Sequence, residues 1–260
     1  MTGQGQSQGT PRSEATTAEP DAVAITAASR DLGRDLSEPQ ARGLAAYLSQ
    51  LMRWNKRMNL VGARTWQVAL SDLAADSWHL ADLLHALPLP PEPVTMDLGA
   101  GAGLPGLPLR LFWDSGQYLL VELRAKRAVF LRYALEAMQL PRTEVMEGRA
   151  EHALARRGPA DLVLGRAFLP WREFLALVEG HVNCMALIMA NEPPPQADDI
   201  PPGWLPYGFH AYPSGRGERY YWVFIPESAS RSESLKINLV ATASAFSPIS
   251  MSRSRKSSSS

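Results

Sequence analysis

Two carboxylates and a run of glycines have the residue types and spacing of a nucleoside-binding site. Residues 97–106 read DLGAGAGLPG after a short apolar stretch, and Glu122 ends a second apolar stretch. Glycines at alternate positions, beginning with Gly99 and Gly101, let the backbone turn tightly and approach a ligand closely. A carboxylate at Glu122 can accept two hydrogen bonds from a ribose diol. With Asp97 ahead of the glycines, the pattern predicts that a nucleoside cofactor binds here.

The glycine run fits two classes of cofactor. Residues 101–106 match the dinucleotide fingerprint G-x-G-x-x-G, which would make the protein an NAD(P)-dependent oxidoreductase. However, the run starts earlier, at Gly99, and Pro105 removes a backbone N–H that a pyrophosphate would use. Asp97 suits a cationic ligand better than a diphosphate, and S-adenosyl-L-methionine carries both an ammonium and a sulfonium group. We therefore expect S-adenosyl-L-methionine and keep the oxidoreductase as an alternative.

Short apolar segments alternate with helical ones from residue 94 onward. A helix is expected over residues 125–139, where Val129, Phe130 and Tyr133 recur at helical spacing. Short buried strands joined by helices predict an α/β fold with a parallel sheet covered on both faces and an antiparallel hairpin at its end. The predicted strands are residues 94–96, 118–121, 144–146, 161–164 and 183–189, and the hairpin joins residues 209–212 to 220–225.

The composition predicts one folded domain between two tails. The chain has 260 residues, 26 basic and 26 acidic side chains and a single cysteine, so no intrachain disulfide is available. Residues 31–227 are expected to fold, with a helical extension at 31–90 and the Rossmann-like part at 94–227. Residues 1–30 and the serine-rich residues 228–260 have too few apolar side chains to offset chain ordering, so we expect both to be disordered.

The sequence has no feature of a membrane or secreted protein. No run approaches the ~18 apolar residues that a membrane helix needs, and the N-terminus lacks a charged segment followed by an apolar one. A single cysteine is typical of a reducing compartment. We expect a cytoplasmic monomer with no membrane partner. We also expect no metal, because His181 and Cys184 alone are too few ligands for a zinc site.

Further motifs on both sides of the glycine loop resemble a known family. The matching segments are DLGAGAGLPGLPL at residues 97–109, VELRAKRAVFL at 121–131, GRAE at 148–151, GRAF at 165–168 and GERY at 217–220. They are similar to the bacterial small-subunit ribosomal RNA methyltransferase G family, also called glucose-inhibited division protein B. The resemblance spans about residues 37–226, which is most of the part expected to fold.

The resemblance implies a class I S-adenosylmethionine-dependent methyltransferase fold, with a mostly parallel seven-stranded sheet and an N-terminal helical extension. Members of that family transfer a methyl group from S-adenosyl-L-methionine to N7 of a guanosine in 16S ribosomal RNA. By matching motif, Gly99 and Leu104 would line the methionine and sulfonium region of the cofactor. Glu122 would hold the ribose, and Ala150 and Glu151 would contact the edge of the adenine.

Three arginines complete the site that the resemblance implies. Arg166 would lie at the mouth of the cofactor site, and Arg149, Arg166 and Arg219 would face the RNA as the catalytic set. Guanine N7 is unprotonated at neutral pH, so methyl transfer needs no general base and depends on alignment of the reacting atoms. Arginine pKa values stay above ~12, so these side chains would contact phosphates or stack on bases rather than move protons.

The expected partner is 16S ribosomal RNA or the small ribosomal subunit. The chain departs from the family pattern at residues 72–73, which read Asp-Leu, and at residues 191–192, which read Asn-Glu. These departures affect substrate contacts more than the cofactor site. They leave open a second alternative, a non-catalytic RNA-binding factor for ribosome assembly that keeps the cofactor fold.

Overall fold

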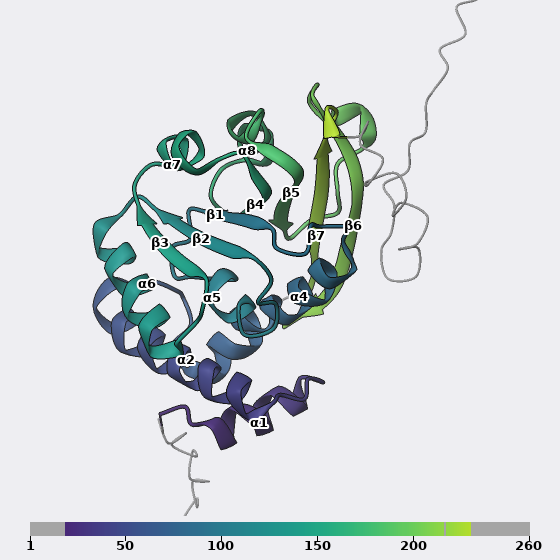
Figure 1. Cartoon of the computed structure of the whole chain (residues 1–260). Helices are drawn as coiled ribbons and strands as arrows, with labels where there is room; N and C mark the ends of the chain where they lie inside the picture. The colour runs from purple at the N-terminus through teal and green to yellow at the C-terminus, as the bar shows by residue number, and fades with distance from the viewer. Residues whose placement is uncertain (1–18, 216, 230–260) are drawn as a thin grey trace, which may run out of the picture.

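A seven-stranded sheet forms the centre of the molecule (Figure 1). The structure is a computed structural model that describes residues 19–215 and 217–229. The strand order is β3-β2-β1-β4-β5-β7-β6, in which β1 to β5 are parallel and β7 is antiparallel to both of its neighbours. The strands are β1 (Val94–Leu98), β2 (Gln117–Glu122), β3 (Thr143–Glu147), β4 (Ala160–Arg166), β5 (Val182–Ala190), β6 (Trp204–Ser214) and β7 (Gly217–Pro226).

Helices cover both faces of the sheet, and each layer buries its own apolar core (Figure 1). Residues of α2 and α6 pack on one face, whereas residues of α7 and α8 pack on the other. The helices are α1 (Ala22–Asp31), α2 (Glu38–Met58), α3 (Trp66–Ala69), the π-helix η1 (Leu70–Ala74), α4 (Asp76–Ala86), α5 (Gly106–Leu109), α6 (Ala125–Met138), α7 (Ala150–Arg157), α8 (Trp171–Val178) and the 3-10 helix η2 (Ala197–Asp199). In residues 19–215 and 217–229, no helix combines the length and the apolar character that crossing a membrane requires.

The predicted α/β architecture is confirmed, including the terminal hairpin that β6 and β7 form. Each predicted strand lies within an observed one, and the helix expected over residues 125–139 is α6. The helical extension expected at residues 31–90 contains an irregularity, because the π-helix η1 separates α3 from α4. A π-turn widens the helix by one residue per turn and rotates the side chains that follow it. It therefore sets the direction of Asp76, the first residue of α4.

The prediction that residues 1–30 lack structure is wrong for their last part, where α1 forms. The Asp21 carboxylate accepts a hydrogen bond from the Ala24 N–H at 2.8 Å and caps the first turn. Ile25 and Ser29 are fully buried against the rest of the molecule, and α1 packs on α2. So few buried positions give no apolar periodicity, and the helix depends on tertiary packing. Residues 1–18 and 230–260 lie outside the described residues.

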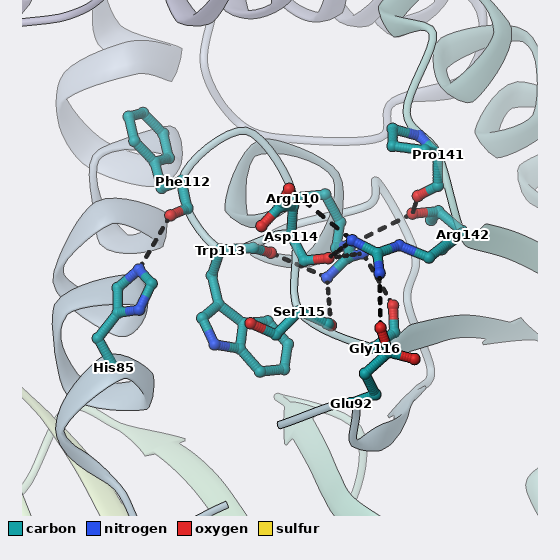
Figure 2. Close-up of polar contacts among 11 residues, drawn as sticks. His85, Glu92, Arg110, Phe112, Trp113, Asp114, Ser115, Gly116, Pro141 and Arg142 are labelled. Atoms are coloured by element: carbon teal, nitrogen blue, oxygen red, sulfur yellow. Dashed lines mark hydrogen bonds and ion pairs between the residues drawn. The ribbon is translucent and has the colours of Figure 1, made fainter. Parts of the chain in front are cut away.

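A buried arginine organises the turn between α5 and β2, at the amino ends of the strands (Figure 2). The Arg110 guanidinium donates to the carbonyl oxygens of Trp113 at 2.9 Å and Ser115 at 2.9 Å. It also donates to the carbonyls of Asp114 and Gly116 and, through Nε, to the Thr143 hydroxyl. Without these bonds four carbonyl groups of one turn would lose an intramolecular partner. This turn places the start of β2 beside β1.

Replacing this arginine tests its structural role. We expect Arg110→Met to lower the free energy of unfolding by about 3 kcal/mol or more, because buried carbonyls lose charged donors. Urea denaturation measures this loss. Arg142→Met is the matched control, since the half-exposed Arg142 pairs with Glu92 at 3.4 Å nearby and should cost about 1 kcal/mol or less. Equal losses in both variants would contradict the role assigned to Arg110.

Candidate functional site

The glycine loop leaves β1 at the carboxyl edge of the sheet and is tied to the end of β2. Gly99 and Gly101 have φ of 71° and 58°, values that favour glycine. The Gly101 N–H donates to Glu122 Oε2 at 2.9 Å, and the Arg124 N–H donates to Oε1 of the same carboxylate at 2.8 Å. Glu122 is buried. Its carboxylate therefore connects the loop to β2 while each oxygen keeps a lone pair for a ligand.

Two N-terminal helices hold the same loop from its other side. The Tyr47 hydroxyl of α2 donates to the carbonyl oxygen of Ala102 at 2.8 Å. The Ser77 hydroxyl of α4 donates to the carbonyl oxygen of Pro105 at 3.1 Å. Tyr47 cannot be singled out from the sequence, because a tyrosine at a core position of an amphipathic helix has no distinguishing pattern. The helical segment is thus part of the site's support, rather than an appendage to the sheet.

The residues predicted to contact the adenine lie next to Glu122. Strand β3 pairs with β2 so that Glu147 is the register partner of Glu122, and the Gly148 N–H donates to the Glu122 carbonyl at 3.0 Å. Ala150 and Glu151 then begin α7, with Ala150 buried and Glu151 exposed. The predicted ribose and adenine residues therefore occupy neighbouring positions at one edge of the sheet.

A buried carboxylate joins two of the three predicted arginines. Arg166 Nη2 lies 3.0 Å from Asp76 Oδ2, and Arg219 pairs with the same oxygen. Burial raises the pKa of Asp76, and the two guanidinium groups oppose that rise. Arg166 Nη1 is buried without a partner among the described residues. We call Asp76, Arg166 and Arg219 the arginine cluster. Because two guanidinium groups share one carboxylate, the cluster keeps an N–H donor, at Arg166 Nη1, for a ligand.

The third predicted arginine is not part of this cluster. Arg149 is exposed at the position that precedes α7, after β3. Strands β2 and β1 separate β3 from β4, which carries Arg166. All three arginines lie along the carboxyl edge of the parallel strands, but only Arg166 and Arg219 lie together. No role for Asp76 could be read from the sequence, because its partners Arg166 and Arg219 lie far away in the chain.

Asp97 lies in a different environment from the one predicted. Its carboxyl group accepts a hydrogen bond from the Tyr118 hydroxyl at 3.2 Å and is buried beside Gly106. Burial raises the pKa of Asp97 to about 8, so the group is neutral at neutral pH. It therefore brings no negative charge to a cationic ligand there. Its role in cofactor binding stays a prediction, as do those of Gly99, Gly101 and Leu104.

The site's residues fit a nucleoside cofactor that carries an amino-acid tail. Space is open at Gly101, where an added Cβ would meet nothing closer than the Gly99 carbonyl oxygen at 3.6 Å. Glu122 offers paired acceptors for a diol, and the Arg166 donor lies near the loop. At Gly99 an added Cβ would clash with the ring of Phe168, which follows β4. Glycine at this position therefore lets the loop pack against that ring.

The antiparallel strand distinguishes this sheet from a dinucleotide-binding one. Classic dinucleotide-binding domains have the parallel order 3-2-1-4-5-6, whereas here β7 lies antiparallel between β5 and β6. A glycine loop after β1 and an acid at the end of β2 accompany this order. Together they define a class I methyltransferase fold, and they count against the oxidoreductase alternative.

Comparison with known proteins identifies the family. The family described as rRNA small subunit methyltransferase G matches residues 40–192. A relative from Nitratidesulfovibrio vulgaris (strain DP4), named ribosomal RNA small subunit methyltransferase G, is 47% identical over 202 residues, which are 78% of this chain and 93% of the relative. A relative of the same name from Oleidesulfovibrio alaskensis is 38% identical and covers 76% of this chain and 91% of its own length. The chain belongs to the rRNA small subunit methyltransferase G family.

A solved structure shares the fold at low sequence identity. The crystal structure of a mutant of MtNAS is 16% identical to this chain. It covers 78% of this chain and 81% of its own, with a TM-score of 0.50. At this identity the likeness concerns the fold only, and it agrees with the class that the strand order defines.

The pKa of Asp97 predicts a pH dependence of stability. The folded-state pKa of about 8 lies above the ordinary value of 3.8, so the group stabilises the fold fully below about pH 4, and the contribution is lost as the pH rises through 8. In Asp97→Asn the side chain cannot ionise, and we expect the free energy of unfolding to fall less between pH 5 and 8 than in the wild type. Urea denaturation at both pH values measures this. Asp114→Asn, at an exposed position, is the control and should follow the wild type.

Replacing the shared carboxylate of the arginine cluster should strongly affect the stability of the fold. We expect Asp76→Asn to lower the free energy of unfolding by about 3 kcal/mol or more, since two buried or half-buried guanidinium groups lose their counter-charge. Asp82→Asn is the matched control, because Asp82 lies on the same helix and pairs with Arg34 at 2.7 Å at the surface. It should cost about 1 kcal/mol or less in the same denaturation experiment. Similar losses for the two variants would contradict the stabilising role assigned to the cluster.

Proposed function

We propose that this protein transfers the methyl group of S-adenosyl-L-methionine to N7 of a guanosine in 16S ribosomal RNA. Its relatives are named as ribosomal RNA small subunit methyltransferases, and the present chain covers nearly their whole length. We further propose that it acts as a cytoplasmic monomer on 16S ribosomal RNA or on the small ribosomal subunit. Family membership supports the activity, whereas the monomeric state and the cytoplasmic location are further parts of the proposal.

One observation carries the proposal: the cofactor loop and the arginine cluster lie along one edge of the sheet. Glu122 and Gly101 are hydrogen-bonded at the ends of β2 and β1, and β4, which carries Arg166, pairs with β1. A nucleoside cofactor and an anionic polynucleotide require adjacent sites of different chemistry. Backbone N–H groups and a buried carboxylate meet the first requirement, and a cluster with two guanidinium groups meets the second.

The proposed reaction requires little proton transfer by the protein's side chains. S-adenosyl-L-methionine would supply the methyl group, whose S–CH3 bond breaks as the bond to guanine N7 forms, with S-adenosylhomocysteine as the leaving group. The N7 lone pair is free at neutral pH. Glu122 holds the ribose, and the glycine loop fixes the amino-acid end. Arg166 and Arg219 attract the RNA and hold it by phosphate or stacking contacts, with Asp76 fixing their direction. Orientation of this kind supplies up to ~7–11 kcal/mol in well-aligned reactions.

Calorimetric titration with S-adenosylhomocysteine, with NADH in parallel, tests the cofactor. We expect micromolar binding of the first ligand and none of the second. A methylation assay on 16S ribosomal RNA, with the product base mapped, then tests the reaction. NADH binding alone would overturn the proposal, and cofactor binding without methylation of free RNA or of the small subunit would favour the non-catalytic assembly factor.

Glu122→Gln tests the ribose contact. We expect the affinity for S-adenosylhomocysteine to fall by about 1.5–3 kcal/mol, since a charged acceptor of hydrogen bonds becomes a neutral amide. Glu147→Gln is the matched control, because Glu147 is the register partner of Glu122 on β3 but pairs with Arg132 at 3.5 Å away from the loop. Its affinity should stay at the wild-type value. Unchanged affinity in Glu122→Gln would show that this carboxylate only braces the loop.

A further inference from the structure

A pocket of about 530 Å³ lies at the carboxyl ends of β4 and β5, beside α8. Aromatic side chains form its walls, and two polar residues that follow β5 lie at its rim. The residues that matter for its chemistry are Phe168, Trp171, Phe174, Trp222, Asn191 and Glu192. A volume of this size accommodates a small planar ligand or one nucleotide.

The aromatic walls are held in fixed orientations. The ring of Trp171 meets Trp222 edge to face, with centroids 6.2 Å apart and planes at 86°. The same ring lies parallel to Phe224, and the Arg172 guanidinium lies 4.3 Å from its centroid. The Trp222 indole N–H donates to the Glu192 carbonyl at 3.1 Å, which anchors the rim to β7. Prearranged aromatic rings of this kind favour a flat π-system such as a nucleobase.

The rim adds a carboxylate that selects among bases. Glu192 is exposed and makes no ion pair within the part of the chain that the structure describes. A carboxylate accepts two parallel hydrogen bonds. Among the four RNA bases, only guanine presents two adjacent donors on its Watson–Crick edge, N1–H and the exocyclic amino group. Adenine places an acceptor beside its amino group, so it cannot satisfy both oxygens. The pocket's chemistry therefore matches guanine.

The pocket shares one side chain with the glycine loop. Phe168 lines the pocket, and its ring also lies against Gly99, where an added Cβ would clash with it. In guanine, N7 lies on the edge opposite to N1 and the exocyclic amino group. A guanine whose Watson–Crick edge is held by Glu192 therefore directs N7 away from Glu192, and Gly165 and Phe168 are among the other residues that line the pocket.

We propose that this pocket receives the target guanine of the RNA and that Glu192 is a specificity-determining residue that reads its Watson–Crick edge. This inference rests on the proposed function, because it supplies the acceptor base for that reaction. An enzyme that modifies a base commonly takes it out of the stack, holds it between aromatic or apolar side chains and reads its Watson–Crick edge. Here Phe168 supplies an aromatic contact, and Trp171, Phe174 and Trp222 complete the apolar lining.

Titration of the full chain with mononucleotides, followed by quenching of tryptophan fluorescence, tests the pocket without turnover. We expect guanosine 5′-monophosphate to bind more tightly than inosine 5′-monophosphate, which lacks the exocyclic amino group, and adenosine 5′-monophosphate to bind weakest. Glu192→Gln should weaken the guanosine nucleotide about tenfold or more and abolish its advantage over the inosine nucleotide. Glu173→Gln, on the exposed side of α8, is the matched control and should leave the order unchanged.

Three results would overturn the inference. The first is equal binding of the three nucleotides, and the second is an unaltered preference in Glu192→Gln. The third is competition between S-adenosylhomocysteine and guanosine 5′-monophosphate, which would assign the pocket to the cofactor. If S-adenosylhomocysteine binds and RNA is methylated while any of these results holds, the proposed function stands and only the pocket assignment fails. If S-adenosylhomocysteine itself does not bind to the wild type, the proposed function fails.

Discussion

The rest of the structure depends on one carboxylate shared by two guanidinium groups. Asp76 comes from the N-terminal helices, Arg166 from the parallel strands and Arg219 from the antiparallel hairpin. The Tyr221 hydroxyl adds a bond to the Asp76 carbonyl oxygen, also from the hairpin. A buried charge is tolerated only when it is paired. The contact therefore requires that all three parts of the chain be docked, and it makes them a single unit.

Hydrogen bonds hold the glycine loop from opposite sides. Glu122 binds its backbone from the sheet, while Tyr47 and Ser77 bind it from the helices. Each of these bonds joins a side chain to a backbone group, so they fix the shape of the loop rather than its charge. A loop whose shape is fixed before binding loses little entropy when it takes up a ligand. The helices that precede the sheet in sequence thus help to fix the shape of this loop.

Features that depend on neighbouring residues can be predicted from the sequence, whereas contacts between residues far apart in the chain cannot. The strands and the glycine loop are predictable because periodicity and turn residues act over a few positions. Asp76 could not be assigned a role, since Arg219 lies 143 residues further along the chain. The raised pKa of Asp97 could not be predicted from the sequence, because burial beside Tyr118 is a tertiary property. Helix α1 was missed for the same reason, since Ile25 is one of only two buried residues in it.

The position of β7 has a consequence for the order in which the protein can be completed. This strand is the last element of the described chain, yet it lies inside the sheet between β5 and β6 rather than at an edge. Until residues 217–226 have left the ribosome, β5 has an open edge and Arg166 lacks the companion that shares its counter-ion. A nascent chain that ends before the hairpin turn therefore holds the cofactor loop but not the complete arginine cluster. The arginine cluster is therefore complete only when the last strand of the sheet has been synthesised.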